Sequence, residues 1–103
     1  MNYKVNQKIE SKKELGAYYV VIGLGETGRS VINFLNSIDV DVIAMDTREK
    51  PPCVDTVLSK ILVLIKGRID HSYLESSEMI VLSPGVSKAD LGCDIFRRYG
   101  SKV

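Results

Sequence analysis

A glycine-rich turn between an apolar run and a helical segment is the feature that most constrains the fold of this chain. Val20–Arg29 read V-V-I-G-L-G-E-T-G-R, which places glycines at positions 23, 25 and 28. In this spacing the first glycine permits a tight turn, the second clears a path to backbone N–H groups, and the third lets the helix press against the strand. The positive end of the helix then faces an anion. The spacing also suits a sharp turn that binds nothing, and the sequence leaves both interpretations open.

Apolar runs alternate with helical segments along the rest of the chain. The runs predict strands at residues 18–23, 41–46, 60–66 and 79–82, with a fifth beginning at 101–103. Helices are predicted behind the glycine turn as far as Ser37, over 70–77 and over 91–99, and Pro51-Pro52 predicts an ordered loop. Strands without alternation, separated by helices, indicate a parallel sheet. We therefore predict an α/β fold, with a Rossmann-like doubly wound, mostly parallel sheet of about five strands and flanking helices.

Three loops of distinctive sequence follow predicted strands. They are Gly23–Gly28, Asp46–Arg48 and Ser83–Gly85. Because ligands of such sheets bind at the carboxyl ends of the strands, we expect these loops to meet at one crevice. Asp46 lies about 20 residues past the turn, where a dinucleotide-binding domain places a carboxylate on ribose hydroxyls, and this favours NAD or NADH. An aspartate at a turn also bonds nearby loop amides, so Asp46 has two interpretations.

Length and charge predict one small domain. The 103 residues, 45% hydrophobic and 26% charged, suffice for a core but not for two ordinary domains. We assign residues 1–17 to a polar N-terminal extension and residues 18–103 to the domain. The formal net charge of +1 argues against nucleic-acid and polybasic membrane partners.

Cysteine and histidine usage predicts no metal site and no disulfide framework. Cys53 and Cys93 form no C-x-x-C pair and lie far from the single histidine, His71. We expect His71 to lie at the surface or to cap a short helix, and we assign no catalytic residue. Residues 1–16 lack the apolar segment of a signal peptide, and no run is long enough to span a membrane. The sequence therefore predicts a cytoplasmic protein.

Three motifs together resemble one family. They are G-L-G-E-T-G-R-S at 23–30, M-D-T-R at 45–48 with two prolines soon after, and L-S-P-G-V at 82–86. In this order and spacing they resemble the N-terminal domain of the UDP-N-acetylmuramoyl-L-alanine:D-glutamate ligases, within the Mur ligase family. The resemblance covers residues 18–103. It implies a Rossmann-like domain that binds the UDP part of the substrate, in place of a nicotinamide cofactor.

The resemblance also implies which residues contact the nucleotide. The Glu26-Thr27 backbone and the Thr27 hydroxyl would contact the diphosphate, Thr47 and Arg48 would flank the uracil, and Ser83 would help to close the pocket. The full expected UDP-binding set is Gly25, Glu26, Thr27, Gly28, Asp46, Thr47, Arg48, Ser83, Pro84 and Gly85. A helix N-terminus suits a diphosphate, and loop backbone groups suit a uracil edge.

Two departures from the family pattern limit what carries over. Glu26 places a carboxylate beside the expected diphosphate, which it would repel unless the side chain points to solvent or Arg29 offsets its charge. The chain also carries no G-x-x-G-K-[ST] loop, which would bind ATP in the central domain. We therefore expect an excised domain, or else a truncated product, of a ligase that uses ATP and Mg²⁺, and we expect no turnover by these 103 residues alone.

Three hypotheses follow from the sequence. The first is a UDP-binding domain of a Mur ligase, whose partners are a UDP-sugar substrate and the remaining ligase domains. The second is an NAD(H)-binding domain of a dehydrogenase or a regulatory module. The third is a scaffold whose glycine turn binds nothing. Arg48 and the 83–85 loop discriminate among them, because only the first hypothesis uses both.

Overall fold

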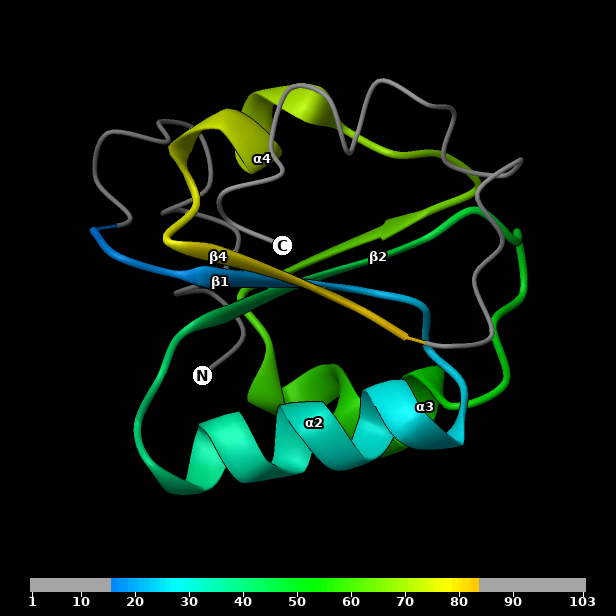
Figure 1. The fold of residues 1–103 in the computed structure, drawn as a ribbon. Coiled ribbons are helices and arrows are strands. Elements are labelled where there is room, and N and C mark those ends of the chain that lie inside the picture. The colour runs from blue at the N-terminus through cyan, green and yellow to red at the C-terminus, as the bar shows by residue number, and fades with distance from the viewer. Residues whose placement is uncertain (1–15, 84–103) are drawn as a thin grey trace.

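The computed structural model describes residues 16–83, which form a parallel four-stranded sheet with helices on both faces (Figure 1). Its elements, in chain order, are β1 (Tyr19–Ile22), α2 (Glu26–Ser37), β2 (Val42–Asp46), α3 (Val54–Val57), the 3₁₀ helix η2 (Leu58–Lys60), β3 (Val63–Lys66), α4 (His71–Ser76) and β4 (Met79–Leu82).

The strand order β3-β2-β1-β4 confirms the Rossmann-like prediction. The chain steps outward from β1 through β2 to β3 and then returns to place β4 on the other side of β1. The order therefore reverses between β1 and β4, and a crevice at the carboxyl ends of these strands is where such sheets bind ligands. The helix predicted over 91–99 and the fifth strand predicted at 101–103 lie outside the described residues.

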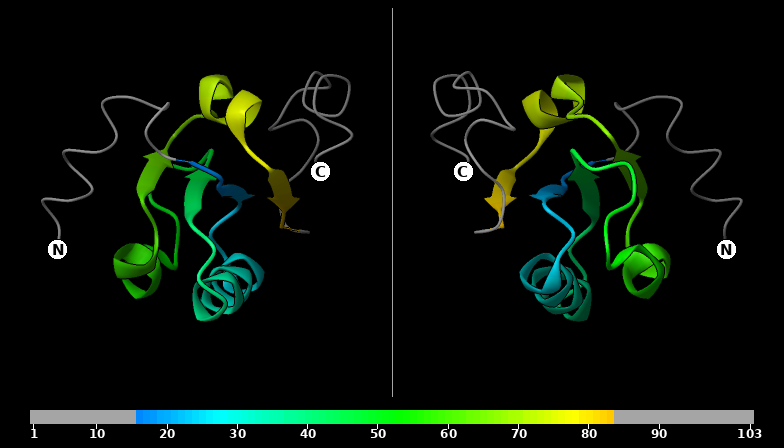
Figure 2. Two further views of the ribbon diagram at one scale, coloured as in Figure 1. Left: turned by 90° about the vertical axis from the view of Figure 1, so that its left-hand side faces the viewer. Right: turned by 90° about the vertical axis from the view of Figure 1, so that its right-hand side faces the viewer.

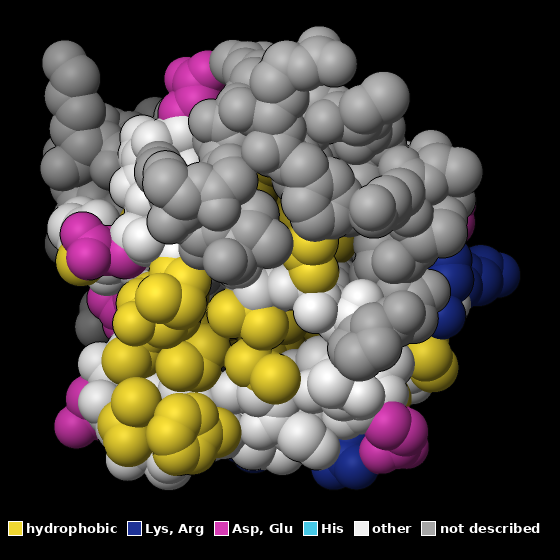
Figure 3. All heavy atoms as spheres, viewed as in Figure 1, with side chains coloured by type: hydrophobic (Ala, Val, Ile, Leu, Met, Phe, Trp, Pro, Cys, Tyr) yellow, Lys and Arg dark blue, Asp and Glu magenta, His cyan; other side chains and the backbone are white. Residues whose placement is uncertain are grey.

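Two apolar layers hold the sheet between its helices (Figures 1 and 2). On the face of α2 and α3 the buried cluster consists of Val21, Leu24, Ile32, Leu35, Val42, Ala44, Val57 and Ile61. On the face of α4 it consists of Tyr18, Val20, Ile22, Ile43, Met45, Val63, Ile65, Leu74 and Ile80. Successive strand residues enter opposite layers, so both faces are apolar and the strands read as continuous hydrophobic runs. Apolar side chains also gather on the surface over α2 and the neighbouring edge of the sheet (Figure 3).

The segment between β2 and β3 differs most from the prediction. Residues 54–60 form α3 and η2, which the sequence did not predict, and β3 begins at Val63 instead of residue 60. Ile61 instead enters the core between the sheet and α2. A run of aliphatic residues does not reveal which members belong to a strand and which pack beside it. None of the helices within residues 16–83 is long and apolar enough to cross a bilayer.

Helix α2 ends in a reversal that places an aspartate in a conformation favoured by glycine. The N–H of Val40 donates to the carbonyl of Leu35 at 2.9 Å, and the N–H of Asp39 donates to the carbonyl of Asn36 at 3.1 Å. This is the Schellman pattern, and Asp39 occupies its left-handed position with a φ of 63°. Asp39 also places a negative charge at the negative end of the helix dipole.

Replacement of this aspartate should stabilise the domain. Asp39→Gly relieves the left-handed strain and removes the charge, so we expect the free energy of unfolding to rise by about 0.5–1 kcal/mol. Urea unfolding measures the change. The matched control is Asp41→Gly, which removes an exposed aspartate two residues later where φ is not positive. It should not stabilise the protein, and an equal gain from both variants would refute the explanation.

Candidate functional site

Backbone hydrogen bonds join the glycine turn to the neighbouring loops at the carboxyl edge of the sheet. The N–H of Gly23 donates to the carbonyl of Met45 at 2.8 Å, and the N–H of Cys53 donates to the carbonyl of Leu24 at 3.2 Å. On the other side of β1, the N–H of Ser83 donates to the carbonyl of Ile22 at 2.9 Å. The turn, the loop after β2 and the end of β4 therefore lie at one edge, as expected.

The three glycines of the turn are required for different reasons. Gly23 has a φ of 104°, which side chains rarely adopt. A Cβ atom on Gly28 would lie 1.8 Å from the carbonyl oxygen of Gly23, so this glycine allows α2 to pack on the turn. Gly25 has a φ of −92°, and a Cβ atom there would have nothing within 4 Å. Neither backbone conformation nor packing within the described residues requires a glycine at position 25, and the described residues leave the space in front of it open.

Helix α2 presents free donors beside Gly25. The first hydrogen bond of its N-terminus runs from the N–H of Arg29 to the carbonyl of Gly25 at 2.9 Å. Among residues 16–83, no acceptor is found for the N–H groups of Glu26, Thr27 and Gly28, and no side chain caps the helix. These N–H groups point out of the helix end and carry its partial positive charge. An anion seated in front of Gly25 would accept from them.

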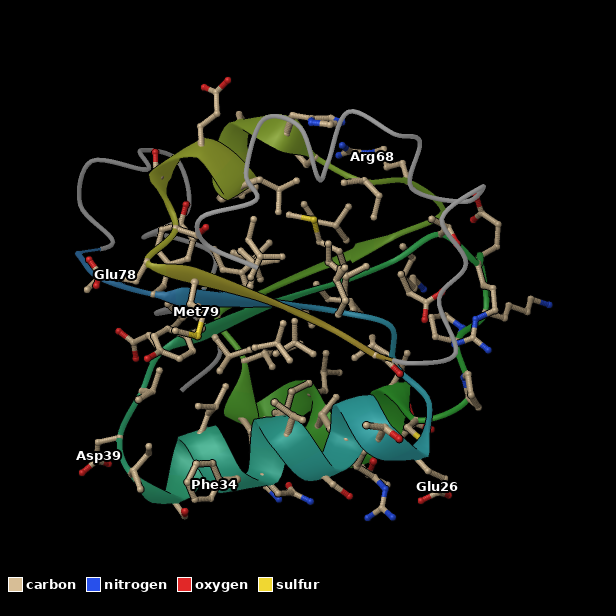
Figure 4. All side chains as sticks on the ribbon, viewed as in Figure 1. Glu26, Phe34, Asp39, Arg68, Glu78 and Met79 are labelled. Carbon is tan, nitrogen blue, oxygen red and sulfur yellow. The ribbon has the colours of Figure 1, made fainter. Side chains whose placement is uncertain are left out.

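Glu26 does not block this helix end. Its side chain is 82% exposed and forms an ion pair with Arg29, one helical turn further on. Figure 4 shows Glu26 at the outer side of the first turn, directed away from the sheet. Hydrogen bonding to Glu26 raises the pKa of Arg29, so the pair keeps its positive member charged. Because the carboxylate is exposed to solvent and Arg29 offsets its charge, an anion can still occupy the helix end.

Asp46 connects the glycine turn to the loop after β2. The residue is 2% exposed, and its carboxylate accepts four hydrogen bonds. Oδ2 accepts from the N–H of Leu24 at 2.7 Å and from the Arg48 guanidinium at 2.7 Å. Oδ1 accepts from the N–H of Arg48 at 2.8 Å and from its Nε at 2.9 Å. Asp46 therefore accepts hydrogen bonds from loop amides, and donors of the protein itself fill the acceptor positions of its carboxylate.

These hydrogen bonds set the ionisation of Asp46. Burial alone would raise the pKa of the carboxyl, but the Arg48 guanidinium and the N–H groups of Leu24 and Arg48 outweigh it. The pKa of Asp46 therefore lies below its ordinary value, and the carboxylate stays charged at neutral pH. The hydrogen bond to Asp46 in turn raises the pKa of Arg48. The Arg48 side chain remains 53% exposed, so this side chain is held in place yet accessible at the carboxyl edge of the sheet.

Gly67 fixes the same loop from the side of β3. Its N–H donates both to the carbonyl of Asp46 at 2.8 Å and to the carbonyl of Arg48 at 3.0 Å, and its φ is 79°. Sequence reasoning missed this contact, although a lone glycine just after an apolar run is the signal that could have found it. Thr47, between the two accepting residues, is half-buried.

The remaining predicted site residues divide between described and undescribed parts. Ser83 is buried, at 8% exposure, and Thr27 is exposed at the start of α2. Pro84 and Gly85 lie outside the described residues. Within the described residues, no three or more histidines, cysteines, aspartates or glutamates are grouped to hold a metal ion. A separate hollow of about 390 Å³, lined by residues 36, 39–42 and 59–62, lies at the opposite, amino end of the sheet.

Comparison with known proteins gives a consistent result. Residues 17–101 match the family described as "Mur ligase MurD-like, N-terminal domain". The chain is similar to proteins named UDP-N-acetylmuramoylalanine–D-glutamate ligase. The relative from Shewanella oneidensis is 37% identical over 71 residues, 67% of this chain and 16% of the relative. The relative from Haemophilus influenzae (strain PittEE) is 39% identical over 67 residues, 65% of this chain and 15% of the relative.

A third relative of the same name is similar to this chain to a comparable extent. The ligase from Mannheimia succiniciproducens is 40% identical over 72 residues, 70% of this chain and 16% of the relative. The matched region thus spans about a sixth of the length of these curated relatives.

Two glycine substitutions should separate packing from ligand access. Gly28→Ala forces its Cβ atom against the Gly23 carbonyl, and we expect it to lower the free energy of unfolding by about 1–3 kcal/mol. Gly25→Ser meets open space and supplies a good helix cap, so we expect a change of only a few tenths of a kcal/mol. Urea unfolding of both variants measures the difference. A large loss in Gly25→Ser would show that position 25 is structural.

The Asp46 carboxylate should contribute stability that depends on pH. Asp46→Asn removes the charge and leaves buried donors poorly matched, so we expect a loss of about 1–3 kcal/mol near neutral pH. Because the folded-state pKa is depressed, the contribution is complete above the ordinary aspartate pKa of 3.8 and is lost as pH falls through the folded pKa. Urea unfolding across this range should show the wild-type advantage vanish in acid. Exposed Asp55→Asn is the control, and a pH-independent difference would contradict the assignment.

Proposed function

Because the chain belongs to the family of MurD-like N-terminal domains of Mur ligases, we propose that the carboxyl edge of its sheet binds the UDP part of UDP-N-acetylmuramoyl-L-alanine. The observation that carries this proposal is Gly25, a glycine for which packing and backbone conformation give no reason, in front of three N–H groups without a described acceptor. A diphosphate is an anion of the kind that such a helix end binds through backbone donors.

The diphosphate would lie in front of Gly25. The N–H groups of Glu26, Thr27 and Gly28 donate to its oxygens, and the exposed Thr27 hydroxyl adds a further donor. A side chain at position 25 would project into the same space, so the open approach there is part of the site. Arg29 offsets the charge of the solvated Glu26 carboxylate, which limits its repulsion of the ligand.

The uracil would lie between the loop after β2 and the end of β4. Thr47 and Arg48 flank it on one side, and Ser83, with Pro84 and Gly85 beyond the described residues, closes the other. This placement is supported by the strand order, which reverses between β1 and β4. In such sheets the ligand binds at the carboxyl ends of the strands on either side of the reversal. In this proposal Asp46 acts through Arg48, whose guanidinium it holds at the edge of the crevice.

The dinucleotide hypothesis is not favoured. It requires the Asp46 carboxylate to accept hydrogen bonds from ribose hydroxyls. That carboxylate is buried and already accepts from Leu24 and Arg48. To bind a ribose it would have to release donors that hold the turn and the loop together, and buried donors left without partners are costly.

The proposed role in the whole ligase is to anchor the substrate far from the reaction. There ATP and Mg²⁺, bound by other domains, would allow the carboxylate of the UDP-substrate to be phosphorylated and then attacked by the amine of D-glutamate, with ADP and phosphate released. No described residue takes part in that chemistry. Binding energy gained at the remote nucleotide end positions the reacting carboxylate. The predicted cytoplasmic location belongs to the same proposal.

An amide NMR titration with UDP-N-acetylmuramoyl-L-alanine, and separately with NADH, tests the site. We expect the UDP ligand alone to shift the amides of Gly23–Gly28, Thr47–Arg48, Ser83 and Gly85. Gly25→Ser should raise the dissociation constant at least about tenfold, equivalent to about 1.4 kcal/mol, because its side chain fills the diphosphate position.

Two controls separate this prediction from its alternatives. The free energy of unfolding of Gly25→Ser should change by only about a few tenths of a kcal/mol, so a lost shift reports binding rather than folding. Shifts with NADH only would show that the site binds a dinucleotide. An unchanged affinity of Gly25→Ser for the UDP ligand would show that the diphosphate does not bind at the glycine turn.

A further inference from the structure

An apolar patch covers the outer side of α2 and the neighbouring edge of the sheet (Figure 3). Its centre consists of Phe34, Ile38 and Met79, whose exposed fractions are 62%, 52% and 43%. Phe34 lies on α2 and Ile38, four residues later, is the C-cap of that helix; Figure 4 shows Phe34 and Met79 on the same side of the molecule. Tyr19, the register partner of Met79, and Val31, on α2, are half-buried and extend the patch toward the core. Apolar surface gathered in this way marks a contact site.

Carboxylates border this apolar patch at the amino end of the sheet. Asp39, Asp41 and Glu78 are exposed, and none forms an ion pair with another described residue. Figure 4 shows Asp39 and Glu78 at the same end of the molecule, with Met79 next to Glu78. The three acids and residues 17–19 line a hollow of about 210 Å³. A partner for this surface should therefore combine an apolar stripe with positive charge.

Residues 1–15 have this combination in their sequence. Met1, Val5 and Ile9 recur every four residues, which places them on one stripe of a helix. The lysines at 4, 8 and 12 recur at the same interval, one position earlier, and form the adjacent stripe. The stripe on the other side carries Asn2, Asn6, Glu10 and Glu14. A helix over this segment would be apolar on one stripe from Met1 to Ile9, with Lys13 at the next position of that stripe, and basic on the stripe beside it.

We propose that residues 1–15 dock as an amphipathic helix on the apolar patch, with the lysine stripe against the acidic border. The described part begins at Gly16, three residues before Tyr19. Residues 1–15 are therefore joined to the domain beside the hollow and the patch. A helix of 15 residues is about 22 Å long, which is enough to follow α2 past Ile38 to Phe34. Attachment to β1 supplies the helix at high local concentration, so weak contacts suffice.

NMR of the full chain at low concentration tests the docking directly. We expect nuclear Overhauser contacts between the Ile9 methyl groups and the Phe34 ring. Ile9→Asp should abolish them and shift the amides of Phe34, Ile38 and Met79, while the amides of β2 stay unchanged. Asn6→Asp is the matched control, because it adds the same charge to the same segment on the polar stripe and should leave the contacts intact.

A charge exchange tests the acidic border. Lys8→Glu should weaken the contacts, and Glu78→Lys in the same chain should restore them. The proposal is overturned if wild type shows no contact between residues 1–15 and the patch. It is also overturned if the chemical shifts of the patch amides do not change in Ile9→Asp but do change with protein concentration, since a second copy would then be the occupant.

Discussion

The buried carboxylate of Asp46 is the interaction on which the carboxyl edge of this domain depends. A charge removed from water is costly unless its acceptor positions are filled, and here four donors fill them. Two of those donors come from different segments: the N–H of Leu24 in the glycine turn and the side chain of Arg48 in the next loop. The cost of burial is therefore offset only when the turn and the loop adopt this relative position. Through this requirement Asp46, together with the backbone hydrogen bonds donated by Gly23 and Cys53, sets the distance between the two halves of the proposed nucleotide site.

The order of strands and helices could be predicted from the sequence because burial on both faces makes each strand a continuous apolar run. The segment between β2 and β3 was harder, since Val54–Lys60 shows no sustained helical period and forms two short helical pieces, held mainly by packing of Val57 and Ile61 against α2. For Asp46 the sequence predicted the position but left two roles open. Its role depends on whether Arg48 folds back onto it, and that is a tertiary choice which spacing does not determine.

The structure distinguishes the roles of the three glycines of the turn, which the sequence left with two interpretations. If all three glycines were explained by backbone strain or packing, a turn that binds nothing would account for the motif. Gly23 and Gly28 have such explanations, but Gly25 does not. Glu26 fits the same interpretation, because its carboxylate interacts with Arg29 and solvent and leaves the helix end accessible. The ligand hypothesis therefore depends on position 25, rather than on the number of glycines.

Helix α2 places the two proposed binding surfaces at opposite ends of the domain. Its 12 residues span about 18 Å, with the free N–H groups at Glu26–Gly28 and the exposed Phe34 and Ile38 toward the other end. A segment that covers the patch therefore stays clear of the diphosphate position. It would instead shield α2 where the helix ends in a strained aspartate with an unfavourable charge. Lysines brought next to Asp39 would reduce that unfavourable charge, so docking and helix stability would favour each other.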